Sequence, residues 1–296
     1  MKIQFLNGGL ANQVFQYIFA RYYELSHPGE FMYLDDSYFA LHTVHNGYEL
    51  EKVFGLKPHM LSECFDDEVW NYILQNKKEG KSIPQILCEN GIEMYMISEV
   101  GDKYAEFNPF EGKVIVVNAN RYEPYILGAT ENVYYHGYWI NKNWFMTYRD
   151  IFSKELQFPA ITESHNLRYM EQIRNTNSVS IHIRRGDYVM IGQALDVETY
   201  RKFVNMFMDK MDMIDWHLFV FSDDIDWCRQ NAEKMNFQRF ANVTYIEGNE
   251  RGNNYRDLQL MSKCKAMIIS NSAFCFLAAL LNTEKKCLLN LTSRDI

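Results

Sequence analysis

The sequence has no apolar run long enough to cross a membrane. Its longest uninterrupted apolar stretch runs from Ala273 to Leu281 and has nine residues, whereas a membrane-spanning helix needs about 20. The chain begins MKIQFLNGG, with one lysine and no long apolar segment, so no secretory signal peptide is visible. We therefore expect a cytoplasmic protein.

Cysteine is scarce, and its spacing fits neither a metal site nor a redox pair. The six cysteines lie far apart with no CxxC among them, which argues against zinc ribbons and thioredoxin-like chemistry. A chain of 296 residues buries enough apolar surface to fold without disulfides. We expect reduced thiols and no metal.

The sequence also lacks an excess of positive charge. Thirty Lys and Arg against 38 Asp and Glu give a formal charge of −8, which argues against a protein that coats nucleic acid or anionic lipid. A dinucleotide-binding GxGxxG motif is missing too, because Gly8-Gly9 does not open one, and this disfavours a dehydrogenase. A single local basic cluster for phosphate remains compatible with the composition.

What the chain does contain is a regular strand–helix alternation in its second half, which predicts βαβ units and a parallel, Rossmann-like sheet. The predicted strands cover residues 178–183, 218–221, 243–246 and 266–269, and the predicted helices 197–211, 224–235, 255–264 and 272–281. The first half opens with a strand over 2–6, a glycine turn at 7–9, and a helix from Asn12 that ends at His27-Pro28-Gly29. Residues 30–150 give no sheet order. The length suggests two domains, which we place at 1–155 and 156–296.

Aromatic residues make up 15% of the chain. Most of them fit a heavy aromatic core, but rings with polar tips also line sugar sites. Composition leaves both interpretations open.

Polar side chains follow three of the predicted strands, where ligands of an open parallel sheet bind. They are Arg184-Arg185-Gly186-Asp187, Ser222-Asp223-Asp224 and Ser270-Asn271-Ser272. Arginine donates paired hydrogen bonds to phosphate, and the strand-to-helix turn at 270–272 offers free N–H groups and hydroxyls. Together they favour a nucleotide with a diphosphate.

Each of these residues also has a purely structural interpretation. Arg185 and Asp187 fit internal salt bridges, and for Asp187 this is the favoured reading. Ser222 and Ser272 fit helix N-caps. His182 is equally consistent with a hydrogen-bonded core residue and a nucleotide contact. Asp224-Ile225-Asp226 has the DxD form of metal-dependent sugar transferases, but its carboxylates are expected in a helix's first turn, where they favourably meet the dipole, so no metal is predicted there.

Five segments together resemble the α-1,2-fucosyltransferases of glycosyltransferase family 11. The segment from His182 to Asp187 resembles the HxRRxD motif of that family. The others, in chain order, are Gly8-Gly9-Leu10-Ala11-Asn12-Gln13, His136-Gly137-Tyr138-Trp139, Phe221-Ser222-Asp223-Asp224 and Ser270-Asn271-Ser272-Ala273-Phe274. Two departures stand out: Ala11 replaces a usual glycine, and Cys275-Phe276-Leu277 replaces a tryptophan-rich stretch.

The resemblance implies an α/β, GT-B-like fold with two Rossmann-like domains facing a central cleft, residues 1–155 binding the acceptor and residues 156–296 GDP-fucose. It implies metal-independent, inverting transfer of fucose from GDP-β-L-fucose to the 2-hydroxyl of a terminal galactose. Arg184 would contact the β-phosphate and Asn12 would face the fucose. The remaining nucleotide contacts would be His182, Arg185, Ser222, Asp223, Ser270, Asn271 and Ser272.

The partners implied are GDP-fucose and a galactose-terminated glycan, with peripheral membrane contact if that glycan is lipid-linked and no nucleic acid. The acceptor, the oligomeric state and a general base remain open. Two alternatives also remain: a transferase for another nucleotide sugar, and a binding module without turnover.

Overall fold

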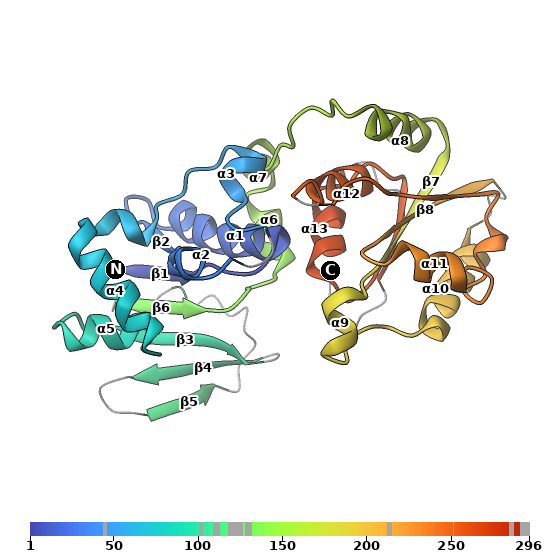
Figure 1. Ribbon diagram of the computed structural model, residues 1–296. Helices are drawn as coiled ribbons and strands as arrows, with labels where there is room; N and C mark the ends of the chain where they lie inside the picture. The colour runs from blue at the N-terminus through green and yellow to red at the C-terminus, as the bar shows by residue number, and fades with distance from the viewer. Residues whose placement is uncertain are drawn as a thin grey trace. The chain divides into compact units, whose positions relative to one another are not determined.

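The computed structural model describes residues 1–43, 46–100, 103–108, 113–117, 127, 132–211, 215–250, 252–283 and 287–290. The chain divides into two compact units, Met1–Glu155 and Leu156–Ile296. Each unit has its own sheet with helices packed on it (Figure 1).

Unit 1 has a mixed sheet with the strand order β2-β1-β6-β3-β4-β5. The strands are β1 (Lys2–Phe5), β2 (Met32–Asp35), β3 (Tyr95–Val100), β4 (Lys103–Asn108), β5 (Lys113–Val117) and β6 (Val133–His136). The first four in the sheet are parallel, and β4 and β5 extend it antiparallel. The parallel part therefore has one carboxyl edge, at which β1, β2, β3 and β6 end together.

The helices of unit 1 follow β1, β2 and β6 in the chain. They are α1 (Leu10–Ser26), α2 (Ser37–Leu41), α3 (Leu50–Phe54), α4 (Asp67–Lys78), α5 (Ile83–Glu89), α6 (Lys142–Thr147), α7 (Arg149–Glu155) and the 3₁₀ turn η1 (Leu61–Cys64). On one sheet face, Ile73 of α4 and Ile86 of α5 pack against Ile3 and Tyr134.

Helix α1 confirms the predicted strand–turn–helix opening and ends at His27. Gly8 makes the turn with φ 78°, a conformation that costs glycine nothing. Phe19 of α1 stacks on Trp139 with 4.9 Å between ring centroids and also contacts Tyr135. These rings form a core, so the aromatic content at this face is structural.

Unit 2 has a fully parallel sheet with the order β11-β10-β7-β8-β9, as the strand–helix alternation predicts. Its strands are β7 (Asn177–Ile183), β8 (Trp216–Ser222), β9 (Asn242–Tyr245), β10 (Ala266–Ile269) and β11 (Cys287–Asn290). Its helices are α8 (Ser164–Asn175), α9 (Gly186–Met190), α10 (Val197–Lys210), α11 (Ile225–Asn231), α12 (Tyr255–Met261), α13 (Ala273–Leu281) and the 3₁₀ turn η3 (Phe237–Arg239).

Two helices of unit 2 are shorter than predicted. Helix α11 ends at Asn231, whose side-chain amide donates to the carbonyl of Trp227, and such local bonds compete with continued helix. Helix α12 ends at Met261 rather than at residue 264. Helices α10 and α13 confirm the predicted ranges to within one residue. Helix α10 buries Tyr200, Val204 and Phe207, and α13 contributes six buried residues.

The five cysteines whose side chains the structure describes are free thiols, as expected. Burial raises the pKa of each of them: Cys64, Cys88, Cys228, Cys264 and Cys275. Within the described ranges, no helix is both long and apolar enough to span a bilayer.

Candidate active site

The polar segments predicted to share a site in unit 2 do meet at the carboxyl edge of its sheet. Ile183 at the end of β7 is paired with Ser222 at the end of β8, and Ile268 of β10 with Ile181 of β7. The chain runs from β7 to β8 on one side, while β10 lies on the other side of β7. This is a topological switch point, where open parallel sheets bind ligands.

Arg184 leaves β7 at this edge and holds two carboxylates. Its Nη2 lies 2.8 Å from Asp187 Oδ1, and its Nη1 lies 2.8 Å from Asp223 Oδ2. The Asp187 pair is the internal ion pair favoured from the sequence. About a third of the Arg184 side chain remains exposed, and the guanidinium lies over the Tyr188 ring at 5.6 Å. The fork is therefore oriented in advance and still accessible to an anion.

Arg185 is engaged in a different way. Its guanidinium lies 3.9 Å from the centroid of the Trp227 ring, and its Nε lies 3.2 Å from Asp224 Oδ2. These contacts tie the end of β7 to the start of α11. The planar face and the Nε donor of Arg185 are therefore both occupied by side chains of α11 and its N-cap.

Asp223 joins the two arginine positions. Its Oδ1 accepts from the backbone N–H of Arg185 at 2.8 Å, while Oδ2 holds Arg184. The same carboxylate packs on Gly186, where a Cβ would lie 2.7 Å from Asp223 Oδ2. Glycine in the HxRRxD segment thus permits the close approach of this carboxylate.

His182 and Ser270 are joined across the switch point. His182 Nδ1 lies 3.1 Å from Ser270 Oγ, and the ring stacks on Phe274 with 5.5 Å between centroids. Burial, with a smaller effect of Arg184, lowers the pKa of His182 to about 3. The imidazole is therefore neutral in the working pH range and fits a hydrogen-bonding role rather than a cationic one.

The remaining residues of the predicted site shape its loops. Ser272 caps α13, accepting from the N–H of Phe274 at 3.3 Å. Asn271 donates to the carbonyl of Gln193 at 2.9 Å, and its buried Oδ1 lacks a partner among the described residues. The N-cap interpretation of Ser222 does not hold. Asp224 caps α11 because its carboxylate reaches the N–H of Trp227, while Ser222 Oγ accepts from Asp224 N.

The two carboxylates of the DxD segment point to different partners. Asp224 caps α11 and pairs with Arg185. Asp226 is exposed in the first turn of α11 and pairs with Arg229 at 3.4 Å. No cluster of His, Cys, Asp and Glu suited to a metal occurs within the described ranges. Both carboxylates thus have structural partners.

Asn12 lies in unit 1, in the first turn of α1 at the carboxyl edge of that sheet. It packs on Gly8, where a Cβ would meet Asn12 Nδ2 at 2.7 Å. Its amide makes no hydrogen bond within the described part of the chain. Ala11 is helical and buried, so the loss of the usual glycine causes no strain: the left-handed position is Gly8.

Two glutamines that the sequence analysis did not single out hold this turn. Gln13 is fully buried, donating to the carbonyls of Gly8 and Gly47 at 2.9 Å. Gln16 bonds the Asn7 side chain at 2.8 Å and the carbonyl of Gly137 at 3.2 Å. Their separation of one helical turn is the signal that could have marked them as a buried polar pair.

A polar cluster in unit 2 was also missed. Asn249 donates to Asp257 Oδ1 at 2.7 Å and is paired with Asn166, while His165 Nε2 lies 3.2 Å from Asn249 Oδ1. The residues come from three separate segments, so no local pattern brings them together. Burial raises the pKa of Asp257 to about 7.

Asp257 is expected to make the protein less stable as the pH rises from about 4 to 7. The folded state keeps the carboxyl protonated in this window while the unfolded state releases the proton. The free energy of unfolding therefore falls, by at most about 1.4 kcal/mol per pH unit. The Asp257→Asn variant keeps an acceptor for Asn249 and does not titrate. Denaturant unfolding of the wild type and of Asp257→Asn should show that the difference between their free energies of unfolding grows as the pH rises.

Asp196→Asn supplies a control of opposite sign. Hydrogen bonds from Thr199 lower the pKa of Asp196, so its contribution is lost as the pH falls, not as it rises. Parallel pH profiles for the wild type and Asp257→Asn would contradict the assignment.

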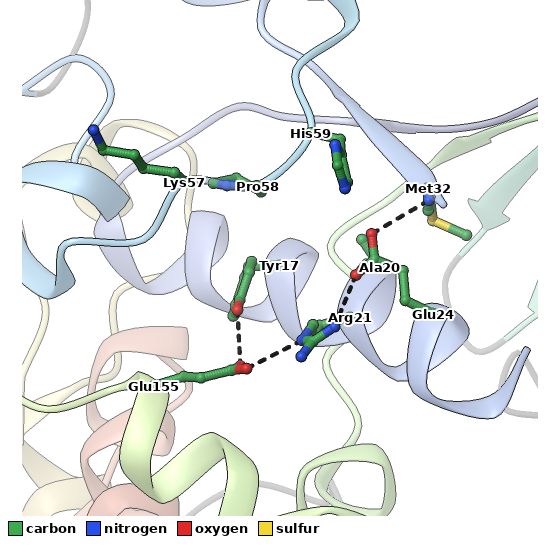
Figure 2. A pocket seen from close by; sticks show the side chains of 9 residues that line it. All are labelled: Tyr17, Ala20, Arg21, Glu24, Met32, Lys57, Pro58, His59 and Glu155. Carbon is green, nitrogen blue, oxygen red and sulfur yellow. Dashed lines mark hydrogen bonds and ion pairs between the residues drawn. The ribbon is translucent and has the colours of Figure 1, made fainter. Parts of the chain in front are cut away.

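Unit 1 contains a pocket of about 240 Å³ at the opposite, amino edge of its sheet, shown in Figure 2. Its lining consists of Tyr17, Ala20, Arg21, Glu24, Met32, Lys57, Pro58, His59 and Glu155. Tyr17 donates to Glu155 Oε2 at 2.8 Å, and Arg21 pairs with Glu155 and with Glu24, each at 3.1 Å. The charged groups of Arg21, Glu24 and Glu155 pair with one another. Met32 is the first residue of β2, so the pocket lies near the amino end of that strand, whereas the Asn12 turn lies at the carboxyl edge of the sheet.

The chain is similar to known glycosyltransferases. The sequence model described as Glycosyl transferase family 11 matches residues 117–295. An alpha-1,2-colitosyltransferase from Escherichia coli is 30% identical over 273 residues, covering 91% of this chain and 83% of that protein. The galactoside 2-alpha-L-fucosyltransferase SEC1 of Bos taurus is 29% identical over 118 residues, covering 36% of this chain and 29% of that protein.

The fucosyltransferase NodZ from Bradyrhizobium has a similar solved structure, with a TM-score of 0.51 and 11% identity over 95% of this chain and 92% of that chain. At this identity the likeness shows the fold, which is GT-B with two Rossmann-like domains, as predicted. The match to more than half of the chain by the family's sequence model, together with the colitosyltransferase relative, establishes that the chain belongs to glycosyltransferase family 11.

Proposed function

We propose that this protein transfers L-fucose from GDP-β-L-fucose to the 2-hydroxyl of a terminal galactose. In this reaction the galactose oxygen forms a bond to the anomeric carbon from the face opposite GDP. The bond between that carbon and the β-phosphate oxygen breaks, GDP leaves with the electron pair, and the hydroxyl proton passes to solvent or a base. One displacement inverts the β-donor to an α-product.

The observation that carries the proposal is the placement of Arg184. Its fork stands at the switch point of a parallel sheet, is fixed by Asp187 and Asp223 at 2.8 Å, and remains partly exposed. Negative charge grows on the leaving diphosphate as the bond breaks. A preoriented guanidinium therefore stabilises the transition state more than the bound donor, which raises the rate.

The other residues would bind and orient the donor. Arg185, Asp223 and Ser222 fix the loop that presents Arg184. Neutral His182 and Ser270 would donate and accept hydrogen bonds at the nucleotide, and the turn from Ser270 to Ser272 begins α13, whose first N–H groups suit phosphate oxygens.

We assign residues 156–296 to the donor and residues 1–155 to the acceptor. Asn12 supports the second assignment, because its amide lies at the carboxyl edge of the unit 1 sheet and makes no hydrogen bond to the residues that the structure describes. In the proposed reaction it contacts the fucosyl group. The acceptor is a galactose-terminated oligosaccharide or polysaccharide, lipid-linked repeats included.

The reaction is proposed to need no metal. Asp224 and Asp226 are used as a helix cap and in ion pairs with Arg185 and Arg229. The positive charge at the diphosphate would come from Arg184 instead.

The test is GDP release from GDP-fucose with lactose as acceptor, with and without excess EDTA. We expect release that depends on lactose and survives EDTA. Release abolished by EDTA would keep the transferase and overturn its metal independence. If the protein binds GDP-fucose but releases no GDP with any galactoside, it is a binding module.

A second donor is favoured by one specific observation, the 30% identity to an alpha-1,2-colitosyltransferase. The same assay with a nucleotide-activated form of colitose distinguishes the two. A higher kcat/KM for the colitose donor would replace fucose in the proposal and leave the roles of the unit 2 residues unchanged.

A further inference from the structure

A group of aromatic side chains lies at the carboxyl edge of the unit 1 sheet. Phe5 ends β1 and stacks on His136, which ends β6, with 4.9 Å between ring centroids and 12° between planes. Tyr38 of α2 meets Phe5 edge-on at 6.0 Å and contacts His42 at 4.9 Å. His42 and His136 are exposed. Phe5 is partly buried against the core of unit 1, whereas the two imidazoles face solvent.

Tyr138 joins this group from the loop after β6. Its side chain is 39% exposed, whereas the next residue, Trp139, is fully buried. Burial raises the pKa of Tyr138, a hydrogen bond with Asn7 lowers it, and the nearby Tyr38 phenol raises it further. Tyr138 follows His136 by two residues, so it lies at the same carboxyl edge of the sheet. We call Phe5, Tyr38, His42, His136 and Tyr138 the ring platform.

The loop that carries Tyr138 is held in place by buried contacts. Glu99 Oε2 accepts from the N–H groups of Tyr138 and Trp139 at 2.5 and 3.0 Å. The carbonyl of Gly137 accepts from Gln4 and Gln16 at 2.9 and 3.2 Å. A Cβ at Gly137 would lie 2.6 Å from Glu99, so only glycine fits. Trp139 has φ 52°. This much fixed structure supports one exposed tyrosine.

We propose that the ring platform binds the terminal galactose of the acceptor by stacking, with Tyr38 and Tyr138 as the main contacts. Galactose has an axial 4-hydroxyl, so one face of its ring presents a patch of C–H groups that packs on aromatic surface. The phenol tips and the imidazoles supply hydrogen bonds at the rim, as in other sugar sites. Asn12 lies at the same edge, on the turn that follows Phe5. The inference rests on the proposed function and specifies its acceptor site.

The test uses Tyr38→Ala, Tyr138→Ala and Tyr138→Phe in the full chain, with lactose as acceptor. Each alanine variant should raise the KM for lactose about three- to tenfold, while GDP-fucose affinity and its slow hydrolysis without acceptor stay unchanged. Tyr138→Phe keeps the ring and should restore most of the lactose affinity. Phe31→Ala is the matched control, because this ring is 52% exposed just before β2 at the opposite edge.

Binding of lactose measured by NMR separates this inference from the proposed reaction. If the wild type releases no GDP but binds lactose, and the alanine variants bind it less, the ring platform stands while the reaction fails. Wild-type KM in both alanine variants, or an equal loss in Phe31→Ala, would overturn the ring platform. Failure of the wild type to bind any galactoside would overturn it as well.

Discussion

Arg184→Ala is expected to lower kcat by about a hundred- to a thousand-fold, or about 3–4 kcal/mol of barrier. Its two ion pairs hold the guanidinium at the place where the leaving group is proposed to gain charge. Removing it also leaves Asp187 and Asp223 without their partner, adding negative charge near the diphosphate. Arg184→Lys keeps the charge but loses the fork, so an intermediate rate is expected.

Arg229→Ala provides a matched control for this experiment. Arg229 also lies between two carboxylates, Asp226 and Glu247, and over a tyrosine ring at 4.9 Å. It comes from the middle of α11 and is outside the proposed site. Steady-state GDP release should remain within about threefold of wild type, since pairs this exposed contribute little. Near-normal turnover in Arg184→Ala would remove Arg184 from the mechanism.

The second large effect concerns stability. Arg256→Met is expected to destabilise unit 2 by about 2–4 kcal/mol. The Arg256 side chain is 4% exposed and pairs with Glu163 at 3.2 Å. Its two terminal nitrogens donate to the carbonyls of Pro159 and Ala160 at 2.8 and 3.0 Å. Methionine has similar length but no donor, so the Ala160 carbonyl loses this hydrogen bond, while the Pro159 carbonyl keeps its bond from Gln259 at 3.1 Å.

Denaturant unfolding with Arg201→Met as the control measures this loss. Arg201 pairs with Glu198 one turn away on α10, and both side chains are about half exposed. That pair contributes at most about 0.5 kcal/mol. Equal midpoints for the Arg256 and Arg201 variants would show that the buried network adds nothing beyond a surface pair.

The fold of unit 2 was predictable because its pattern is local. Each of the four predicted strands is a short apolar run, and a helix follows it before the next strand begins. Such units form parallel sheets. Unit 1 was not predictable in the same way. Lys2 of β1 pairs with Val133 of β6, and β4 and β5 extend the sheet antiparallel. Pairing across so much chain leaves no periodic signal.

The candidate site was predicted as a set of residues, and the structure distinguishes their roles. Because Arg184, Asp223 and Ser270 each follow or come near the end of a strand, the sequence correctly predicted that they lie at one edge of the sheet. It did not show that Arg185 lies flat on Trp227 or that Asp224, not Ser222, caps α11. These depend on side-chain packing between segments, which a single sequence does not encode in any spacing.

The ring platform gives a second example of side-chain placement that the sequence alone does not determine. The sequence placed Tyr138 and Trp139 in one motif, yet one is exposed and the other fully buried. The left-handed backbone at Trp139 and the carboxylate of Glu99 turn them in different directions. Aromatic composition alone therefore does not distinguish buried rings from exposed ones, whereas the loop geometry does.

The buried thiol of Cys275 offers a reporter of motion at the nucleotide edge. Its Sγ lies 3.2 Å from the carbonyl of Ser272 and 3.5 Å from Ser270 Oγ, directly beneath the turn proposed to hold phosphate. Only the thiolate reacts with alkylating reagents, and burial raises the pKa of this thiol. Labelling at Cys275 therefore requires the turn to open, so the rate of alkylation depends on how often the turn opens. A donor nucleotide that binds the turn would slow the labelling of Cys275. The labelling rate therefore reports donor binding in the absence of acceptor and of turnover.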